Sequence, residues 1–135
     1  MIGLDTTVLV RLLVDDDEEQ SGLARELATA VTPAAPAFVS LVVWVESYWV
    51  LHRAYGIAPD EVLEVFEELA GRDEVLSENP RAVAHALRAA REGADFADAL
   101  IDASAQQAGC EVVASFDQKA QRALGWSSPA DLVTG

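Results

Sequence analysis

The sequence predicts an α/β domain with a mostly parallel central sheet and helices on both faces. Three observations support this prediction. Short apolar segments typical of strands recur along the chain, longer segments with apolar residues at helical spacing separate them, and prolines and glycines mark the boundaries. The resulting order of strand, helices, strand, helices, strand is typical of a parallel sheet, because parallel strands need crossover connections. We therefore expect one domain, 1–135, without an interdomain linker.

Each expected element has its own signal in the sequence. Strands are expected where apolar residues run without helical spacing, at 1–4, 37–39, 75–76 and 111–114. Asp and Pro residues begin most of the helices, and Gly or Pro residues follow their ends. The expected helices cover 6–14, 41–54, 59–71, 80–92, 96–109 and 117–125, and another starts in an acidic turn at 15–19 and continues to about 31.

Composition limits the kinds of protein that the chain can be. Its hydrophobic content of 51% excludes a disordered protein, and its 23 acidic against 9 basic side chains give a net charge of -14. Such a surface repels polyanions, so composition alone argues against nucleic acid unless metal ions and local arginines reverse the field. The single Cys110 cannot form an internal disulfide and is expected in the core. With no signal peptide or membrane span in the sequence, a cytoplasmic location is expected.

Four carboxylates lie where a strand passes into a helix or about one turn into a helix. They are Asp5, Glu46, Asp98 and Asp117. Ligands of parallel sheets bind beyond the carboxyl ends of the strands, and helix N-termini favour negative charge there, so these acids are expected to share one pocket. Oxygen ligands without Cys or His select hard cations such as Mg²⁺ or Mn²⁺ over zinc.

The segments around these acids resemble the four motifs of PIN domains, especially those of VapC toxins from bacterial type II toxin–antitoxin pairs. The segments are IGLDTTVLV at 2–10, WVE at 44–46, ADFADALI at 94–101 and VVASFD at 112–117. No single motif is specific, but the four occur in the family's order and spacing over nearly the whole chain.

The resemblance implies a PIN-like three-layer sandwich and a metal-dependent endoribonuclease. Asp5, Glu46, Asp98 and Asp117 would bind Mg²⁺ or Mn²⁺, and Ser115 holds the position where the family has a supporting Thr or Ser. Thr7 departs from the usual Asn or Ser, and a hydrogen bond from it to Asp5 is expected. The family further implies an RNA substrate, a homodimer, and a small VapB-like antitoxin whose C-terminal segment covers the groove and inserts an arginine among the acids.

Each acid also has a purely structural interpretation. Asp5 and Asp117 can cap helices while they bind metal, and Asp95 is interpreted mainly as the N-cap of the helix that carries Asp98, near the pocket edge. Asp102 is expected on the helix surface. Glu46 is the strongest single indicator of a site, because its apolar sequence neighbours make a surface position hard to explain.

The remaining polar and aromatic residues are given weaker roles. The acidic run at 15–19 is interpreted as a solvated turn, and His52 and His85 have no acidic or Cys partner at ligand spacing. The aromatic residues of 44–51 are expected to form core and a dimer patch. Phosphate contacts are assigned first to the cations nearest the acidic motifs, Lys119 and Arg122, with Arg11 as a further candidate.

Two other classes of protein stay open at this point. A receiver or haloacid-dehalogenase-like phosphoryl-transfer domain also builds a Mg²⁺ pocket from acids at strand ends. Such a phosphoryl-transfer domain requires an acidic pair beside the first strand, or a second Asp at position 7. This chain has Thr7 there. An inactive PIN-like binding module is the other alternative; the complete acid set argues against it, and the low basic content is compatible with it.

Overall fold

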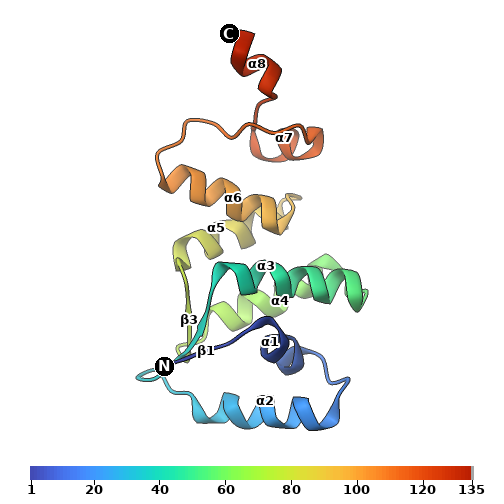
Figure 1. Ribbon diagram of the computed structural model, residues 1–135, viewed down its shortest axis with the longest axis vertical. Coiled ribbons are helices and arrows are strands. Elements are labelled where there is room, and N and C mark those ends of the chain that lie inside the picture. The colour runs from blue at the N-terminus through green and yellow to red at the C-terminus, as the bar shows by residue number, and fades with distance from the viewer. Residues whose placement is uncertain (135) are drawn as a thin grey trace. The chain divides into compact units, whose positions relative to one another are not determined.

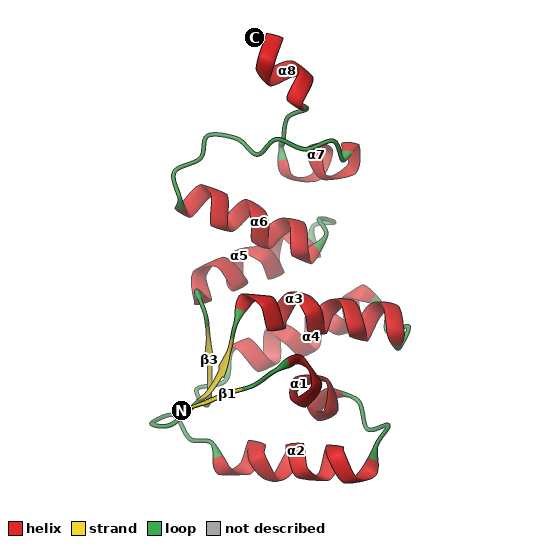
Figure 2. Cartoon of the chain, in the orientation of Figure 1, coloured by secondary structure: helices red, strands yellow, loops and turns green. Residues whose placement is uncertain are grey.

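A computed structural model describes residues 1–134 and confirms the α/β prediction. Gly135, the last residue of the predicted domain, lies outside the described residues. Three parallel strands, β1 (Ile2–Gly3), β2 (Ala37–Val39) and β3 (Val75–Ser77), form a sheet in the order β1-β2-β3. Helices make up most of the rest of the chain (Figures 1 and 2). The chain divides into two compact units, 1–80 and 81–135.

The first unit contains the sheet and the helices that connect its strands. Helices α1 (Thr6–Leu13) and α2 (Glu18–Ala30) join β1 to β2, whereas α3 (Leu41–Trp49), its π-helical continuation η1 (Val50–Ala54), and α4 (Pro59–Ala70) join β2 to β3. These long connections let all three strands run parallel. Their observed positions agree with the helices expected at 6–14, 15–31, 41–54 and 59–71.

Short polar side chains begin the helices of the first unit. Asp5, Asp17 and Ser40 each precede a helix, and each accepts a hydrogen bond from a backbone N–H of the first turn. Pro59 takes the first position of α4, where its missing N–H costs no intrahelical bond. Local sequence therefore determines where the helices start.

The core of the first unit forms where α3 and α4 contribute aromatic and branched side chains. Trp44 of α3 and Phe66 of α4 are fully buried, with ring centroids 4.9 Å apart in an edge-to-face arrangement. On α4, Val62, Leu63 and Phe66 are buried and form the face of the helix that packs into the core. Burial of a side chain of this size stabilises the fold by roughly 1.5–3 kcal/mol.

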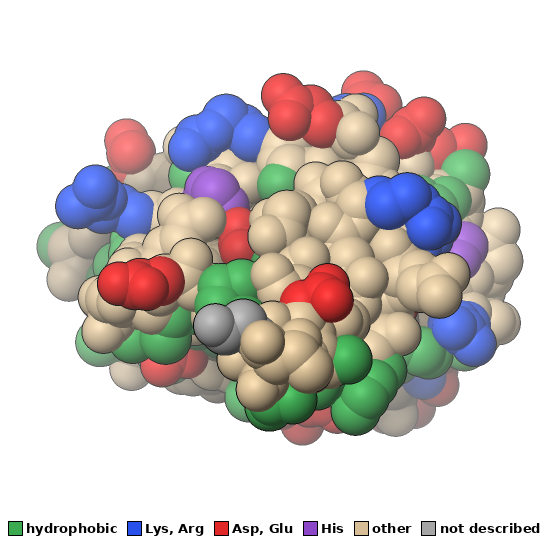
Figure 3. Space-filling view, turned by 90° about the horizontal axis from the view of Figure 1, so that it is seen from above, with side chains coloured by type: hydrophobic (Ala, Val, Ile, Leu, Met, Phe, Trp, Pro, Cys, Tyr) green, Lys and Arg blue, Asp and Glu red, His purple; other side chains and the backbone are tan. Residues whose placement is uncertain are grey.

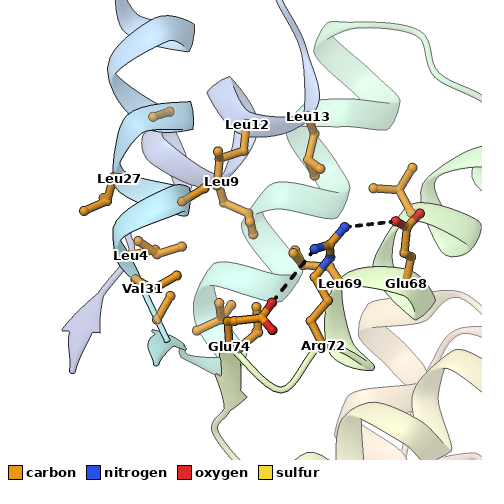
Figure 4. Close-up of a pocket in the computed structure, with 16 residues that line it drawn as sticks. Leu4, Leu9, Leu12, Leu13, Leu27, Val31, Glu68, Leu69, Arg72 and Glu74 are labelled. Carbon is orange, nitrogen blue, oxygen red and sulfur yellow. Dashed lines mark hydrogen bonds and ion pairs between the residues drawn. The ribbon is translucent and has the colours of Figure 1, made fainter. Parts of the chain in front are cut away.

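An apolar hollow of about 290 Å³ lies elsewhere in the first unit. Leucine and valine side chains from α1, α2, α4 and the sheet line it, as the close-up in Figure 4 shows. At its edge Arg72 forms ion pairs with Glu68 and Glu74, at 3.3 and 3.9 Å. The hollow therefore offers an apolar surface beside a rim of paired charges with a net negative charge.

The second unit is helical. It comprises α5 (Pro80–Arg91), which starts at the boundary between the units, α6 (Phe96–Gln107), α7 (Gln118–Leu124) and α8 (Pro129–Thr134), with α6 packed against α7. The first three match the expected helices at 80–92, 96–109 and 117–125. No helix was expected at 129–134, although Pro129 at its start is a helix signal that the sequence carries.

The strand expected at 111–114 is not formed. Ala114 makes a single parallel bridge to Ser127, supported by hydrogen bonds from Ser115 N–H to the Ser127 carbonyl and from Ser127 N–H to the Val113 carbonyl. Apolar composition alone does not make a strand, because a strand also needs a neighbour of matching length. Cys110 is exposed, so its expected core position is also wrong.

Asp102 of α6 is buried, which corrects the expectation of a surface acid. Only 7% of the residue is exposed. Its Oδ1 accepts a hydrogen bond from Trp126 Nε1 at 2.8 Å, and its Oδ2 accepts one from Gln106 Nε2 at 3.0 Å. His85 Nε2 lies 3.4 Å from the same Oδ2, so His85 does have an acidic partner, contrary to expectation. The buried carboxylate is thus compensated by three polar groups, as burial of a charge requires.

Within residues 1–134, no helix combines the length and the apolar character needed to cross a membrane.

Candidate metal centre

Asp5 stands between β1 and α1 in the first unit, at the carboxyl end of the strand. Its Oδ1 accepts hydrogen bonds from Thr7 Oγ1 at 2.7 Å and from the Val8 N–H at 3.1 Å. The expected hydrogen bond from Thr7 is therefore confirmed. The bond from Thr7, followed by the bond from Val8, lowers the pKa of Asp5 below its usual value. The exposed carboxylate is thus held in a fixed orientation and in its anionic form, as a metal ligand must be.

Glu46 lies on an exposed face of α3, so the argument that it could not be a surface residue is wrong. Its sequence neighbours Val43, Trp44, Ser47 and Tyr48 point into the core, whereas Val42, Glu46 and Trp49 share the opposite face and are exposed. Apolar residues surround Glu46 in sequence without surrounding it in space, because a helix separates adjacent residues by about 100°. Its carboxylate is accessible to a ligand.

The expected division of the aromatic segment is confirmed for its core members. Trp44, Tyr48 and Leu51 are buried, whereas Trp49 is 45% exposed. The guanidinium of Arg53 stacks on the Trp49 ring, 4.1 Å from its centroid. The dimer patch stays a prediction.

Glu78 is a carboxylate at the same sheet edge that the sequence argument missed. Pairing of Gly3 with Phe38 and of Val39 with Ser77 aligns the carboxyl ends of the strands. Glu78 follows β3 as Asp5 follows β1, and its Oε1 accepts the Leu41 N–H at the start of α3, at 2.9 Å. The signal that would have found it is an acid immediately after the third strand.

Three carboxylates of the second unit, Asp95, Asp98 and Asp117, interact electrostatically. The pKa of Asp98 is raised above its usual value, first by burial and then by the negative charges of Asp95 and Asp117. Asp95 caps α6, its Oδ2 accepting the Asp98 N–H at 3.0 Å, which confirms the expected N-cap. Asp117 caps α7, its Oδ1 accepting the Ala120 N–H at 3.1 Å. A bound cation would relieve the repulsion that Asp98 experiences.

Ser115 supports Asp117 from the preceding loop. Its Oγ accepts a hydrogen bond from the Asp117 N–H at 3.0 Å, while the Gln121 side chain donates to the Ser115 carbonyl at 2.6 Å. Ser115 therefore joins the loop to the first turn of α7 through both its side chain and its carbonyl. The supporting role at the metal site that the resemblance implies for Ser115 stays a prediction.

The predicted site acids thus fall into two groups, one in each unit of the chain. Asp5 and Glu46 belong to the first unit, whereas Asp95, Asp98 and Asp117 belong to the second. Across residues 1–134, no set of three or more His, Cys, Asp and Glu side chains is arranged closely enough to hold a metal ion as it stands. The chemistry of the donors nevertheless fits Mg²⁺ or Mn²⁺, since all are carboxylate oxygens and Asp98 carries a repulsion that a cation would remove.

The cations proposed for phosphate contacts differ in availability. Lys119 and Arg122 are exposed on α7, close in sequence to Asp117. Arg11 is already engaged, because its guanidinium donates to Asp16, Tyr55 and Gln20 at 2.8–2.9 Å. On the face seen in Figure 3, basic and acidic side chains are interspersed. Contacts to a polyanion must therefore be made by a few specific cations.

Comparison with known proteins identifies the family to which this chain belongs. Residues 2–125 match the PIN domain family, so the chain belongs to that family. Among solved structures it is similar to the crystal structure of Mycobacterium tuberculosis VapC20, described as a sarcin-ricin loop cleaving toxin. The identity is 21%, the alignment covers 94% of this chain and 97% of that chain, and the TM-score is 0.45. No curated protein matches the chain.

Membership of the PIN family confirms the resemblance on which the site assignment depends. The match begins before Asp5 and ends after Asp117, so all four motifs lie inside it. It also extends across the boundary between the two compact units.

Proposed function

We propose that this protein is a metal-dependent endoribonuclease of the VapC type that hydrolyses phosphodiester bonds in RNA. The observation that supports this most is the electrostatic interaction of Asp98 with Asp95 and Asp117 in a PIN-family chain, where burial and then the charges of these two acids raise the pKa of Asp98. Carboxylates are kept together at such a cost where they serve a ligand or a reaction. Oxygen donors alone favour Mg²⁺ or Mn²⁺ as that ligand.

In this proposal Asp5, Glu46, Asp98 and Asp117 hold the cation together, and the two units act as a single domain over 1–135. The family match across both units supports the single domain. Bound Mg²⁺ or Mn²⁺ would supply the acidity that activates water and the positive charge that stabilises a leaving oxygen.

The protein's own groups then have defined tasks. Thr7 fixes the orientation of Asp5 through its 2.7 Å hydrogen bond. The Ser115 contact and the cap of α7 fix Asp117. Lys119 and Arg122 bind the phosphates that flank the cleaved bond, because they are exposed and follow Asp117. No side-chain nucleophile is required.

The partners proposed for the protein follow from the same assignment. A small VapB-like antitoxin would place apolar side chains in the hollow lined by Leu4, Leu9, Leu12 and Val31, and an arginine among the acids. The protein would act as a homodimer in the cytoplasm, with the exposed Trp49 as the candidate dimer contact.

A direct comparison of substrates tests the proposed function. Purified protein with Mg²⁺ is expected to cut a long structured RNA at a few sites and to leave p-nitrophenyl phosphate and acetyl phosphate intact. A phosphoryl-transfer domain would give the reverse result. Turnover of neither substrate type, with RNA still bound, would instead assign the chain to the inactive binding modules.

Phe116 offers a further test of how RNA is held. Its ring is 87% exposed although it stands between Ser115 and Asp117, and exposed aromatic rings stack on unpaired bases. Phe116→Ala is expected to raise KM for RNA about 5- to 160-fold, from a stacking contribution of about 1–3 kcal/mol per base. Steady-state cleavage kinetics measure this change.

Two further variants control this prediction. Phe116→Trp should keep a KM close to that of the wild type, because it retains a stacking surface. Val133→Ala removes another exposed apolar side chain, 83% exposed in α8, and should change nothing. Equal KM values for Phe116→Ala and Val133→Ala would show that Phe116 does not contact RNA.

A further inference from the structure

Charge is distributed very unevenly along this acidic chain. Residues 1–80 carry four basic and sixteen acidic side chains, a net charge of -12, whereas residues 81–135 carry five basic and seven acidic side chains, a net charge of -2. In the first unit Arg11, Arg25 and Arg72 are each paired with carboxylates, and Arg53 stacks on Trp49. Cations that are available to an external anion therefore belong mainly to the second unit.

Three basic side chains line one hollow of the second unit. Arg81, His85 and Arg88 follow one another on α5 at intervals of four and three residues, so they share one face of the helix. This face and the side chains of Gln106 and Gln107 on α6 line a hollow of about 670 Å³. Both arginines are exposed, and neither guanidinium has a hydrogen-bond or ion-pair partner among residues 1–134.

Asp102 fixes the orientation of two side chains that line this hollow. Its Oδ2 contacts both His85 Nε2 and Gln106 Nε2, two groups that line the hollow, and its Oδ1 is occupied by Trp126 Nε1. Because the carboxylate is buried and its oxygens already have donors, it orients the wall without neutralising Arg81 or Arg88. The cationic face is therefore preorganised for a ligand from outside.

We propose that this hollow binds backbone phosphates of the RNA substrate, at a site separate from the metal-binding acids. The guanidinium groups of Arg81 and Arg88 can bind phosphate through paired hydrogen bonds. The lining supplies only Ala84 and Ala103 as apolar side chains, which lacks the large anchors that protein partners use. The proposal rests on RNA being the substrate. It explains how a chain of net charge -14 holds a polyanion.

RNA binding by charge-neutralised variants tests this site. Arg81→Gln/Arg88→Gln is compared with the parent by fluorescence anisotropy on a labelled single-stranded RNA, over a range of salt concentrations. All proteins carry Asp117→Asn and are measured with Mg²⁺, so that the RNA stays intact. The double variant is expected to raise Kd roughly tenfold. The slope of log K against log salt should fall by about 0.7 for each arginine lost, as for single strands.

The control variant Arg25→Gln/Arg72→Gln removes the same charge from the first unit, where both arginines are paired on the surface. It should leave Kd and the salt slope nearly unchanged. Arg81→Lys/Arg88→Lys should recover part of the affinity, because it keeps the charge and loses the paired hydrogen bonds. Melting curves that match the parent would confirm that each variant is folded.

Several outcomes would overturn the proposal. If Arg81→Gln/Arg88→Gln has the Kd and the salt slope of the parent, the hollow is not an RNA site. If the first-unit control weakens RNA binding equally, the loss results from net charge and not from the hollow. Inorganic phosphate that binds at the hollow in calorimetry without competing with RNA would identify a free-anion site instead. If Arg81→Gln/Arg88→Gln no longer binds an acidic protein but binds RNA as the parent does, the hollow is a protein-binding site. Because binding is read without cleavage, failure of the nuclease assignment would leave the result interpretable.

Discussion

Removing divalent metal is expected to abolish RNA cleavage by this protein. The proposed site contains only carboxylates, and carboxylates at neutral pH neither lower the pKa of water far enough nor stabilise a leaving oxygen without a cation. Addition of EDTA should reduce the cleavage rate by several orders of magnitude. Addition of excess Mn²⁺ or Mg²⁺ should restore it. Gel analysis of a labelled RNA before EDTA, after EDTA and after metal is restored measures the effect.

A matched preparation separates this result from contamination. Asp117→Asn, purified in the same way, keeps a helix cap because Asn caps as well as Asp, and it should be inactive with metal present. Cleavage that survives EDTA in the wild type and is absent from Asp117→Asn would contradict a metal mechanism. Cleavage in both would reveal a contaminating ribonuclease.

Replacing Asp98 with Asn is expected to abolish activity and to stabilise the metal-free protein. Burial, together with the charges of Asp95 and Asp117, raises the pKa of Asp98, so its ionised form destabilises the folded state. Asn keeps the shape, and its backbone N–H can still donate to Asp95. The free energy of unfolding without metal should rise by about 0.5–2 kcal/mol, in the range of common stability–activity trade-offs.

The effect on stability has a definite dependence on pH. Below the unfolded pKa of Asp, about 3.9, Asp98 is protonated in both states and contributes nothing. As pH rises through that value towards the raised folded pKa, the unfolded state loses its proton first, so the wild type loses stability. The stability advantage of Asp98→Asn should therefore be absent at low pH, grow over this interval, and stay constant above it.

Thermal melts with and without Mn²⁺ test the same assignment. The wild type should gain stability as RT ln(1 + [L]/Kd), and Asp98→Asn should gain less because it has lost a ligand. Asp102→Asn, which changes a buried acid of the same helix outside the proposed metal site, should lose stability but keep the Mn²⁺ response. If Asp98→Asn melts below the wild type in EDTA and responds equally to Mn²⁺, Asp98 has a structural role and is not a ligand.

Features encoded by local sequence were predictable from it. Asp5, Asp95 and Asp117 cap the helices that follow them, because a cap needs only one side chain and the next three residues. The parallel sheet also followed, since its strands alternate with helices. Thr7 bonds to Asp5 only two residues away, although Thr departs from the usual Asn or Ser of the motif at this position.

Features that depend on distant partners were predicted poorly. Segment 111–114 is apolar, but a strand exists only where another strand pairs with it, and here Ser127 supplies a single bridge. Asp102 was expected at the surface because Trp126, its partner 24 residues away, gives no local signal. The metal-binding role of the four acids stays a prediction, since it depends on how side chains from separate segments converge.

The exposure of Cys110 affects how any dimer of this protein must be demonstrated. The thiol is the chain's single cysteine and it is accessible, so in an oxidising buffer two copies can be joined by an intermolecular disulfide. Such a covalent pair would have the mass of the expected homodimer without any of its packing. A sizing experiment therefore has meaning only with reductant or with Cys110→Ser. The same thiol also provides a unique attachment point for a fluorescent or spin label.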